Sequence, residues 1–168
     1  KRRRQGSSFL LTGGTGFLGS HLAAEFLQNG QRVTLIARPD KHLSAKERVQ
    51  QLLRWHGVGE EKIVQARVIA GDLAQPHLGL DPTLYTDLLH QTDEIIHCAS
   101  DTSFSERKRK EVEKANIQSL KNILDLAGEG CCYYFHHLST AYVAGRRKGL
   151  CREEVVAPDQ FHNVYEET

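Results

Sequence analysis

Methionine is absent from this sequence, and so is any marked excess of charge. Of its 168 residues, 22 are Lys or Arg and 21 are Asp or Glu, so the formal net charge is +1 with the nine histidines neutral. Proteins dedicated to nucleic acids need a basic surplus for the phosphates, and the balance argues against that class. Since even an initiator methionine is missing and the chain opens on Lys1-Arg2-Arg3-Arg4, we expect it to be part of a longer protein.

Long hydrophobic runs and paired cysteines are also missing. No apolar stretch approaches the roughly 18 residues of a membrane span, and no signal peptide opens the chain. The four cysteines, Cys98, Cys131, Cys132 and Cys151, contain no CxxC pair, and two of them are adjacent in sequence. This pattern predicts free thiols in a reducing, cytoplasmic compartment rather than a disulfide scaffold.

What is present is an alternation of short apolar runs with longer amphipathic stretches, the pattern of a parallel sheet wrapped by helices. The apolar runs predict strands at 9–11, 33–37, 66–70, 94–97 and 133–138. The amphipathic stretches predict helices at 18–27, 44–55, 82–90 and 106–127, and a last helix from about His162. Residues 1–7 are expected to be a basic linker or tail, and 8–168 a single α/β domain.

A glycine-rich turn between the first strand and first helix is the strongest motif. It reads Thr12-Gly13-Gly14-Thr15-Gly16-Phe17-Leu18-Gly19, and its glycines at 13, 16 and 19, spaced GxxGxxG, follow a strand and open a helix as a dinucleotide fingerprint does. Glycine permits the tight turn and a close approach to the pyrophosphate, which then faces the first-turn N–H groups of the helix. The predicted cofactor-binding residues here are Gly13, Thr15, Gly16, Phe17, Leu18 and Gly19.

The end of the second strand indicates which dinucleotide is bound. NAD-preferring sites place an acid there for the ribose 2′-hydroxyl, whereas this strand ends Ile36-Ala37-Arg38. Because a guanidinium suits a 2′-phosphate by charge and geometry, Arg38 predicts NADP(H). Arg48, on the next helix, either leans over the same phosphate or is an ordinary surface charge. Asp72, ending the third strand, is expected at the adenine edge.

These residues resemble the extended short-chain dehydrogenase/reductase superfamily, and within it the branch of thioester reductase domains and fatty acyl-CoA reductases. The matching segments, besides the glycine turn, are Gly71-Asp72-Leu73, His97-Cys98-Ala99-Ser100, Asn116 and Leu138-Ser139-Thr140-Ala141-Tyr142-Val143. The resemblance implies a Rossmann-like, doubly wound parallel sheet that is incomplete here, without the carboxyl-terminal strands and substrate domain. It also implies that Leu73, Cys98, Ala99 and Ser100 line the cofactor site.

The superfamily works with a Ser/Thr, a Tyr and a Lys, the last two lying four residues apart on one helix. By resemblance Thr140 is the catalytic hydroxyl, with Ser139 as the fallback, and Tyr165 is the proton donor. The lysine would be residue 169, after the last residue given, so we expect the domain to be truncated at its catalytic helix and to turn over little alone. The plainer alternatives are a strand end or helix cap at Ser139-Thr140 and an ordinary packing residue at Tyr165.

The resemblance implies an NADP(H)-dependent oxidoreductase that converts a CoA- or carrier-bound acyl thioester to an aldehyde or alcohol. Two alternatives stay open: a nucleotide-sugar epimerase/dehydratase or hydroxysteroid-type dehydrogenase, and a non-catalytic NADP-binding sensor. Arg38 argues against the NAD-retaining epimerases. His97, His136 and His137 lack metal-ligand spacing, and Cys98 is better explained as a cleft residue than as a nucleophile, so no metal site is expected. The acyl group and the oligomeric state are left open.

Overall fold

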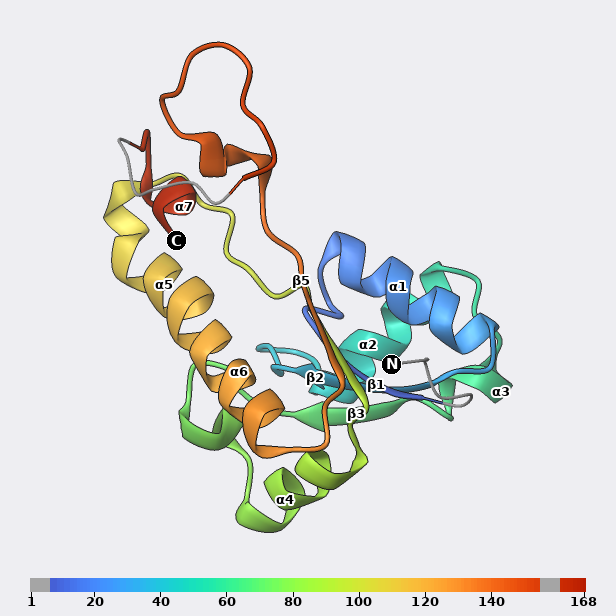
Figure 1. Cartoon of the computed structure of the whole chain (residues 1–168). Coiled ribbons are helices and arrows are strands. Elements are labelled where there is room, and N and C mark those ends of the chain that lie inside the picture. Colours follow the sequence, from blue (N-terminus) through green and yellow to red (C-terminus); the bar gives the residue numbers. More distant parts are fainter. Residues whose placement is uncertain (1–6, 155–160) are drawn as a thin grey trace.

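The computed structural model of the chain describes residues 7–154 and 161–168 (Figure 1). The expected basic tail, apart from Ser7, lies outside these ranges. In the part that is described, five parallel strands form one sheet in the order β3-β2-β1-β4-β5. The strands are β1 (Ser8–Thr12), β2 (Arg32–Ala37), β3 (Arg67–Ala70), β4 (Glu94–His97) and β5 (Tyr134–His137). The predicted doubly wound α/β fold is confirmed.

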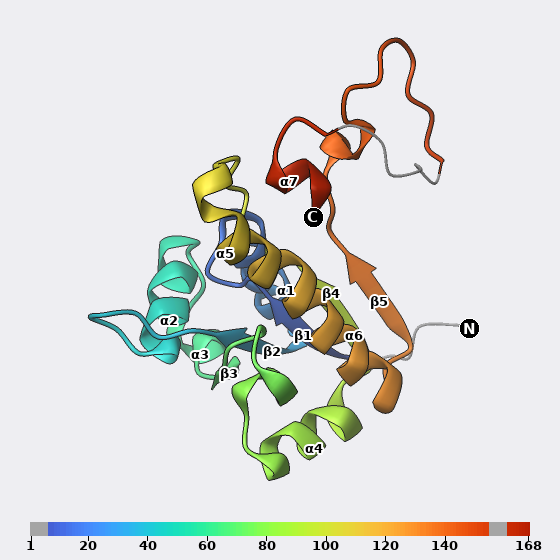
Figure 2. The ribbon, with the colours of Figure 1, turned by 90° about the vertical axis from the view of Figure 1, so that its left-hand side faces the viewer.

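Helices cover both faces of this sheet. The longer elements are α1 (Phe17–Gln28), α2 (Ala45–Trp55), α4 (Pro82–Gln91) and α6 (Ser119–Glu129), and the shorter ones are α3 (Glu60–Ile63), α5 (Arg109–Glu113) and α7 (Val164–Glu167). Figures 1 and 2 show α1, α2 and α3 on one side of the sheet and α4, α5 and α6 on the other. The crossover helices α1 and α6 therefore leave the central strands toward opposite faces.

Alternation along the strands builds a separate core on each face. Leu11 and Leu35 belong to the cluster beneath α1 and α2, while Leu10 and Ile95 belong to the cluster beneath α4 and α6. All four side chains are fully buried. Because successive strand side chains point to opposite faces, strands buried on both faces carry unbroken apolar runs such as Phe9-Leu10-Leu11.

Local sequence signals place most helix boundaries. The Ser44 side chain accepts a hydrogen bond from the Glu47 N–H while Glu47 reaches back to Ser44, a capping box that starts α2 where the sequence predicts. The Asp81 side chain accepts from the Leu84 N–H and caps α4, with Pro82 in the first helical position. Short helical segments at α3 and at two 3-10 turns, Pro76–Gly79 and Ala141–Ala144, were not predicted.

The helix expected over 106–127 is not one regular helix. A 3-10 turn leads into α5, and a π-helical segment, Lys114–Gln118, separates α5 from α6. The wider turn is accompanied by a contact between Ser119 Oγ and the carbonyl of Lys114 at 3.4 Å, five residues back. The π segment contains Asn116, a buried polar residue whose side chain is fully bonded across the molecule. Such interruptions often accompany functional sites.

Candidate functional site

The glycine turn is held by two close backbone approaches. Gly13 has φ +72°, and a Cβ there would lie 2.7 Å from the Ala99 nitrogen. A Cβ on Gly19 would overlap the carbonyl oxygen of Gly13, and the Gly16 N–H donates to that same carbonyl at 2.8 Å. Only glycine satisfies these positions, since any side chain would push α1 away from the turn. The turn therefore presents the amino terminus of α1 to the carboxyl ends of β1 and β4.

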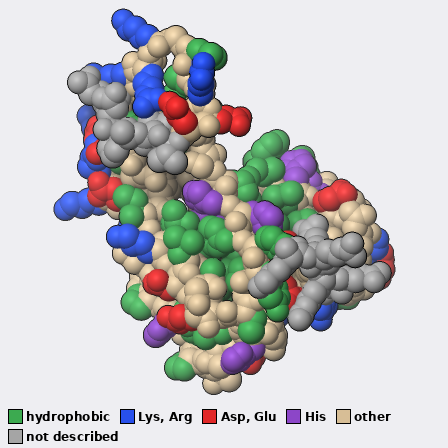
Figure 3. Space-filling view, in the orientation of Figure 1, with side chains coloured by type: hydrophobic (Ala, Val, Ile, Leu, Met, Phe, Trp, Pro, Cys, Tyr) green, Lys and Arg blue, Asp and Glu red, His purple; other side chains and the backbone are tan. Residues whose placement is uncertain are grey.

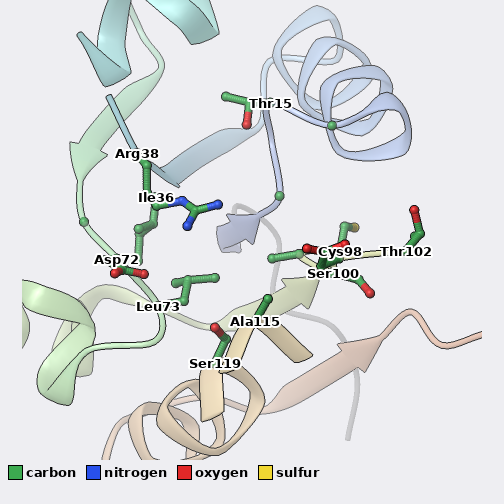
Figure 4. A pocket seen from close by; sticks show the side chains of 15 residues that line it. Thr15, Ile36, Arg38, Asp72, Leu73, Cys98, Ser100, Thr102, Ala115 and Ser119 are labelled. Atoms are coloured by element: carbon green, nitrogen blue, oxygen red, sulfur yellow. The ribbon is translucent and has the colours of Figure 1, made fainter. Parts of the chain in front are cut away.

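A groove of about 410 Å³ opens at these strand ends, where the sheet order reverses (Figure 4). This switch point is where open α/β sheets bind ligands. Nine of the predicted cofactor residues line the groove: Gly13, Thr15, Gly16, Arg38, Asp72, Leu73, Cys98, Ala99 and Ser100. They come from four loops far apart in sequence, and the fold brings them into one surface.

Arg38 and Arg48 occupy different environments. The Arg38 guanidinium extends over the groove, while Arg48 does not line it (Figure 4). Arg48 Nη1 donates to the Arg38 carbonyl, and Arg48 Nε lies 3.2 Å from a carboxylate oxygen of Asp40. The N–H groups of His42 and Leu43, and then Arg48, lower the pKa of Asp40. Arg48 therefore braces the loop from which Arg38 projects.

Three of the predicted cofactor residues, Phe17, Leu18 and Gly19, do not line the groove. The Phe17 ring is 83% exposed and packs 4.7 Å from the His21 ring on the outer side of α1. Their backbone N–H groups belong to the first turn of the helix, which lacks intrahelical acceptors and is available to an anion. The predicted cofactor role of these residues rests on the backbone.

Six further residues line the groove and were not singled out from the sequence: Ile36, Gly71, Asp101, Thr102, Ala115 and Ser119. Ala115 and Ser119 lie four residues apart, so they share one face of the long helix. In a sequence, two small residues four positions apart on a helix can indicate a face that lies close to a ligand. Asp101 and Thr102 extend the loop after β4, a position that marks a candidate site in any parallel sheet.

Between the groove and the sheet lies a buried pair, Thr12 and His97. Thr12 Oγ1 is 2.8 Å from His97 Nδ1 and accepts from the Ala99 N–H at 3.4 Å. Burial, and secondarily the nearby His137, lower the pKa of His97 to about 4, so the imidazole is neutral. Burial likewise raises the pKa of Cys98 to about 11, which makes its thiol a poor nucleophile. These groups shape the loop that carries Ala99 and Ser100.

A second, smaller cavity of about 60 Å³ adjoins the groove and contains the predicted catalytic residues. Ser139, Thr140 and Tyr165 all line it, and its wall shares Ala99 and Ser100 with the groove. The remaining lining residues are His97, Asn116, Leu120, His137, Leu138 and Thr168. Three hydroxyl-bearing residues, two from the loop after β5 and one from α7, thus line one cavity beside the groove.

One backbone contact holds the Thr140 hydroxyl, and another caps the helix that carries Tyr165. Thr140 Oγ1 accepts from the Tyr142 N–H at 3.2 Å, which caps the 3-10 turn after β5 and leaves the Thr140 O–H proton free to be donated elsewhere. Asn163 Oδ1 accepts from the Glu166 N–H at 3.1 Å and starts α7, so Tyr165 lies in the first turn of that helix. The helix-cap alternative for Thr140 is therefore realised and is compatible with a second role.

Polar contacts dock α7 against the long helix. Asn116 Nδ2 donates to Thr168 Oγ1 at 2.8 Å, and Asn116 Oδ1 accepts from the Asp101 N–H at 2.8 Å. Arg109 Nη1 lies 2.7 Å from a carboxylate oxygen of Glu167. Asn116 thus links the loop that lines the groove to the helix that carries Tyr165, a connection its position in sequence does not reveal.

Over 7–154 and 161–168, no group of three or more His, Cys, Asp or Glu side chains is arranged to hold a metal ion. The same residues include no helix with the length and hydropathy needed to cross a membrane.

Comparison with known proteins gives this arrangement a family. The profile of the NAD-binding family described as male sterility protein matches residues 11–168. Fatty acyl-CoA reductase 1 of Gallus gallus is 33% identical over 167 residues, covering 92% of this chain and 31% of that protein. Equisetin synthetase of Fusarium heterosporum is 34% identical over 142 residues, covering 84% of this chain and 3% of that protein. The chain thus spans less than a third of each.

Solved structures share the fold. The terminal R domain from the myxalamid PKS-NRPS pathway superposes with a TM-score of 0.84 at 26% identity, covering 96% of this chain and 42% of that one. UDP-glucose 4-epimerase from Bifidobacterium longum, in complex with NAD+ and UDP, gives a TM-score of 0.69 at 24% identity, covering 96% and 45%, a likeness of fold alone. With the family profile matched over residues 11–168, the chain belongs to the male sterility protein family of NAD-binding domains.

Proposed function

We propose that this chain is the cofactor-binding part of an NADP(H)-dependent reductase that acts on acyl thioesters. The observation that carries the proposal is the cavity lined by Ser139, Thr140 and Tyr165, which shares Ala99 and Ser100 with the groove. Hydroxyl donors thereby stand next to the place where a dinucleotide would end. Similar proteins are named as a fatty acyl-CoA reductase and as the reductase (R) domain of a non-ribosomal peptide synthetase.

The choice of NADP(H) over NAD(H) rests on Arg38. Its guanidinium extends over the groove at the end of β2, the position where an acid would favour a free ribose hydroxyl. A guanidinium there can bind the 2′-phosphate through paired, charge-assisted hydrogen bonds. The adenine edge is assigned to Asp72 and Leu73, which follow the neighbouring strand β3, and the pyrophosphate to the N–H groups of the glycine turn.

The chemistry assigned to the cavity is proton donation to a developing oxyanion. When bound, the cofactor would supply a hydride to the thioester carbonyl carbon, and negative charge would then accumulate on the carbonyl oxygen. Tyr165 is proposed to donate its phenolic proton to that oxygen, and Thr140 to donate a second hydrogen bond, with Ser139 in reserve. The resulting thiohemiacetal collapses to an aldehyde and a free thiol, which conserves atoms and charge.

The epimerase alternative has the weaker support. The epimerases share the fold below 25% identity, whereas a fatty acyl-CoA reductase reaches 33%. A non-catalytic NADP-binding sensor would need the cofactor groove, but it would not need hydroxyl-bearing residues around a neighbouring cavity. The retention of Thr140 and Tyr165 around one cavity therefore favours an enzyme.

The test is cofactor oxidation by the protein that contains this chain. With octanoyl-CoA as the substrate, we expect thioester-dependent loss of NADPH absorbance and one trapped aldehyde per NADPH. The Tyr165→Phe variant, which removes one oxygen atom, should bind NADPH normally and lose about 10²–10⁴-fold in kcat. A protein that binds NADPH tightly yet oxidises none of it with any thioester would contradict the proposal.

A further inference from the structure

The segment that follows β3 folds back on itself beside the cofactor groove. We call residues 71–79 the wall loop. The Asp72 N–H donates to the Leu78 carbonyl at 2.9 Å and closes the loop, while the Gln75 N–H donates to the Asp72 carbonyl at 2.9 Å inside it. The Leu78 side chain is fully buried in the core beneath α4 and α6. Three residues of the wall loop line the groove: Gly71, Asp72 and Leu73 (Figure 4).

Three successive residues of the wall loop have a left-handed backbone conformation. Their φ angles are +50° at His77, +61° at Leu78 and +67° at Gly79. Glycine adopts this region freely, whereas the Cβ of any other residue makes it unfavourable. Strained residues of this kind persist where the surrounding structure holds them, and they are concentrated at functional sites. The wall loop therefore depends on contacts from neighbouring elements.

Those contacts come from packing and hydrogen bonds more than from charge. Asp72 is the one Asp, Glu, Lys or Arg in the wall loop, and its carboxylate accepts from the Ala74 N–H at 3.2 Å within the loop. Figure 3 shows mostly hydrophobic and uncharged side chains over the lower end of the molecule, where the wall loop and α4 lie in Figure 1. Helix α6 packs against the turn Pro76–Gly79, and Ile123 of that helix shares a core with Leu78.

Asn122, on α6, holds the backbone of the wall loop. Its Nδ2 donates to the Leu73 carbonyl at 2.7 Å and to the Gln75 carbonyl at 2.9 Å. Its Oδ1 accepts from Gln118 Nε2 at 2.8 Å, which fixes the orientation of the amide. Asn122 does not line the groove, whereas Ser119, three residues earlier on the same helix face, does. The helix thus forms part of the groove at Ser119 and supports a second wall through Asn122.

We propose that Asn122 is a positioning residue for the cofactor: it holds the strained wall loop in the shape that receives the adenosine half of NADP(H). The inference rests on the proposed function and extends it to a residue outside the groove. The Gly71 N–H donates to the Ala37 carbonyl at 3.2 Å, so the wall loop begins beside the residue that precedes Arg38. A displaced wall loop would therefore change the site that Arg38 and Asp72 are proposed to form around the adenosine. A preformed wall lowers the cost of binding, because less of the site has to be ordered.

Binding of half of the cofactor tests this role without any reaction. The probe is adenosine 2′,5′-bisphosphate, whose Kd is measured by calorimetry with the protein that contains this chain. Asn122→Asp keeps the shape of the side chain but has no N–H to donate to the two carbonyls, so we expect the Kd to rise about tenfold. The matched control is Asn29→Asp, at the end of α1, where the amide donates to the Glu25 carbonyl at 3.0 Å and to its carboxylate at 2.7 Å. That variant also loses two hydrogen bonds and should change the Kd less than about twofold.

Hydrogen exchange and a pair of variants at His77 report on the wall loop itself. Loss of the Asn122 bonds should speed exchange of the Asp72 and Leu78 amides about tenfold, with little change in Asn29→Asp. His77 is exposed and does not line the groove, so a difference between its two variants reflects the backbone. Valine, which is β-branched, disfavours a positive φ, whereas glycine accepts it. We expect His77→Val to bind the bisphosphate about tenfold more weakly than His77→Gly.

Three results would overturn the positioning role. They are an Asn122→Asp protein that binds the bisphosphate as tightly as the parent, an Asn29→Asp protein that is weakened as much as Asn122→Asp, and two His77 variants that bind equally well. A parent protein that does not bind the bisphosphate would overturn the cofactor assignment as well. If the variants behave as expected but no thioester oxidises NADPH, the proposed reaction fails while the positioning role stands.

Discussion

At the scale of single residues, Arg48 holds the backbone of Arg38 in place, while the Arg38 side chain extends over the groove. The loop after β2 is held by Asp40, which accepts from the N–H groups of His42 and Leu43 at 2.8 Å and pairs with Arg48. Arg48 also donates to the Arg38 carbonyl. The backbone of Arg38 is therefore fixed while its side chain is free to meet an anion, which lowers the entropic cost of binding.

The Arg38→Ala variant tests the cofactor assignment. Removing a guanidinium that binds a phosphate should weaken NADPH binding by about 1.5–3 kcal/mol, which is roughly 10- to 150-fold in Kd. NADH lacks the 2′-phosphate, so its Kd should change less than about twofold. Fluorescence titration of both cofactors measures this, with the neighbouring exposed cation removed in Lys41→Ala as the control. An equal loss of affinity for NADPH and NADH would show that Arg38 does not bind the 2′-phosphate.

His97 makes the stability of the domain depend on pH. Its pKa is lowered from 6.5 to about 4, first by burial and then by His137. Between these values the unfolded chain binds the proton and the folded chain does not, so stability falls as the pH falls from 6.5 toward 4. From pH 7 to pH 5 the His97 contribution is a loss of about 2 kcal/mol.

Urea unfolding at the two pH values checks this expectation. The His97→Gln variant keeps a polar group near Thr12 but cannot titrate, so its free energy of unfolding should lose about 2 kcal/mol less than that of the parent over the same interval. An exposed histidine replaced in His42→Gln serves as the control. If both variants keep the full pH dependence of the parent, other groups cause the acid sensitivity.

At the scale of elements, the glycine turn and α1 are the part that the sequence predicts best. The fingerprint spacing requires glycine because of contacts that are purely local or one strand away, such as Gly13 against Ala99. Capping residues placed α2 and α4 for the same reason, since a cap acts within a few residues of itself. By contrast, the docking of α7 depends on Asn116 and Arg109, more than 50 positions earlier, and no local pattern encodes it.

Two glycines in helices offer a matched comparison. Gly19→Ala would press a methyl into the Gly13 carbonyl, so we expect a loss of about 1–3 kcal/mol in stability together with weaker NADPH binding. Gly128 lies in α6 with no atom within 4 Å of an added Cβ, so Gly128→Ala should stabilise the fold by about 0.4–1 kcal/mol. Thermal unfolding and NADPH titration measure both. A Gly19→Ala protein as stable as Gly128→Ala would contradict the close approach.

At the scale of the whole molecule, the sheet and its two cores were predicted from the alternation of apolar runs with amphipathic stretches, because parallel strands covered by helices on both faces carry such runs. The groove was predictable as well, since the ends of parallel strands converge at the switch point. The smaller cavity that holds the proposed catalytic residues and the π segment were not, because they depend on how the chain after β5 packs back onto α5 and α6. The residues were identified by resemblance, and their convergence is a product of tertiary packing.

Because the groove is built from loops of four strands and helices, cofactor binding should stabilise the sheet as one unit. NADPH at about 100 times its Kd adds about 2.7 kcal/mol to the free energy of unfolding, which raises the Tm of a domain this size by about 5–10 °C. Calorimetry with NADPH, with NADH at the same concentration, and with NADPH on Arg38→Ala separates this linkage from a nonspecific ion effect. The shift should be largest for NADPH with the parent chain and shrink in the other two. An equal shift in all three would mean that the stabilising ligand is not held through Arg38.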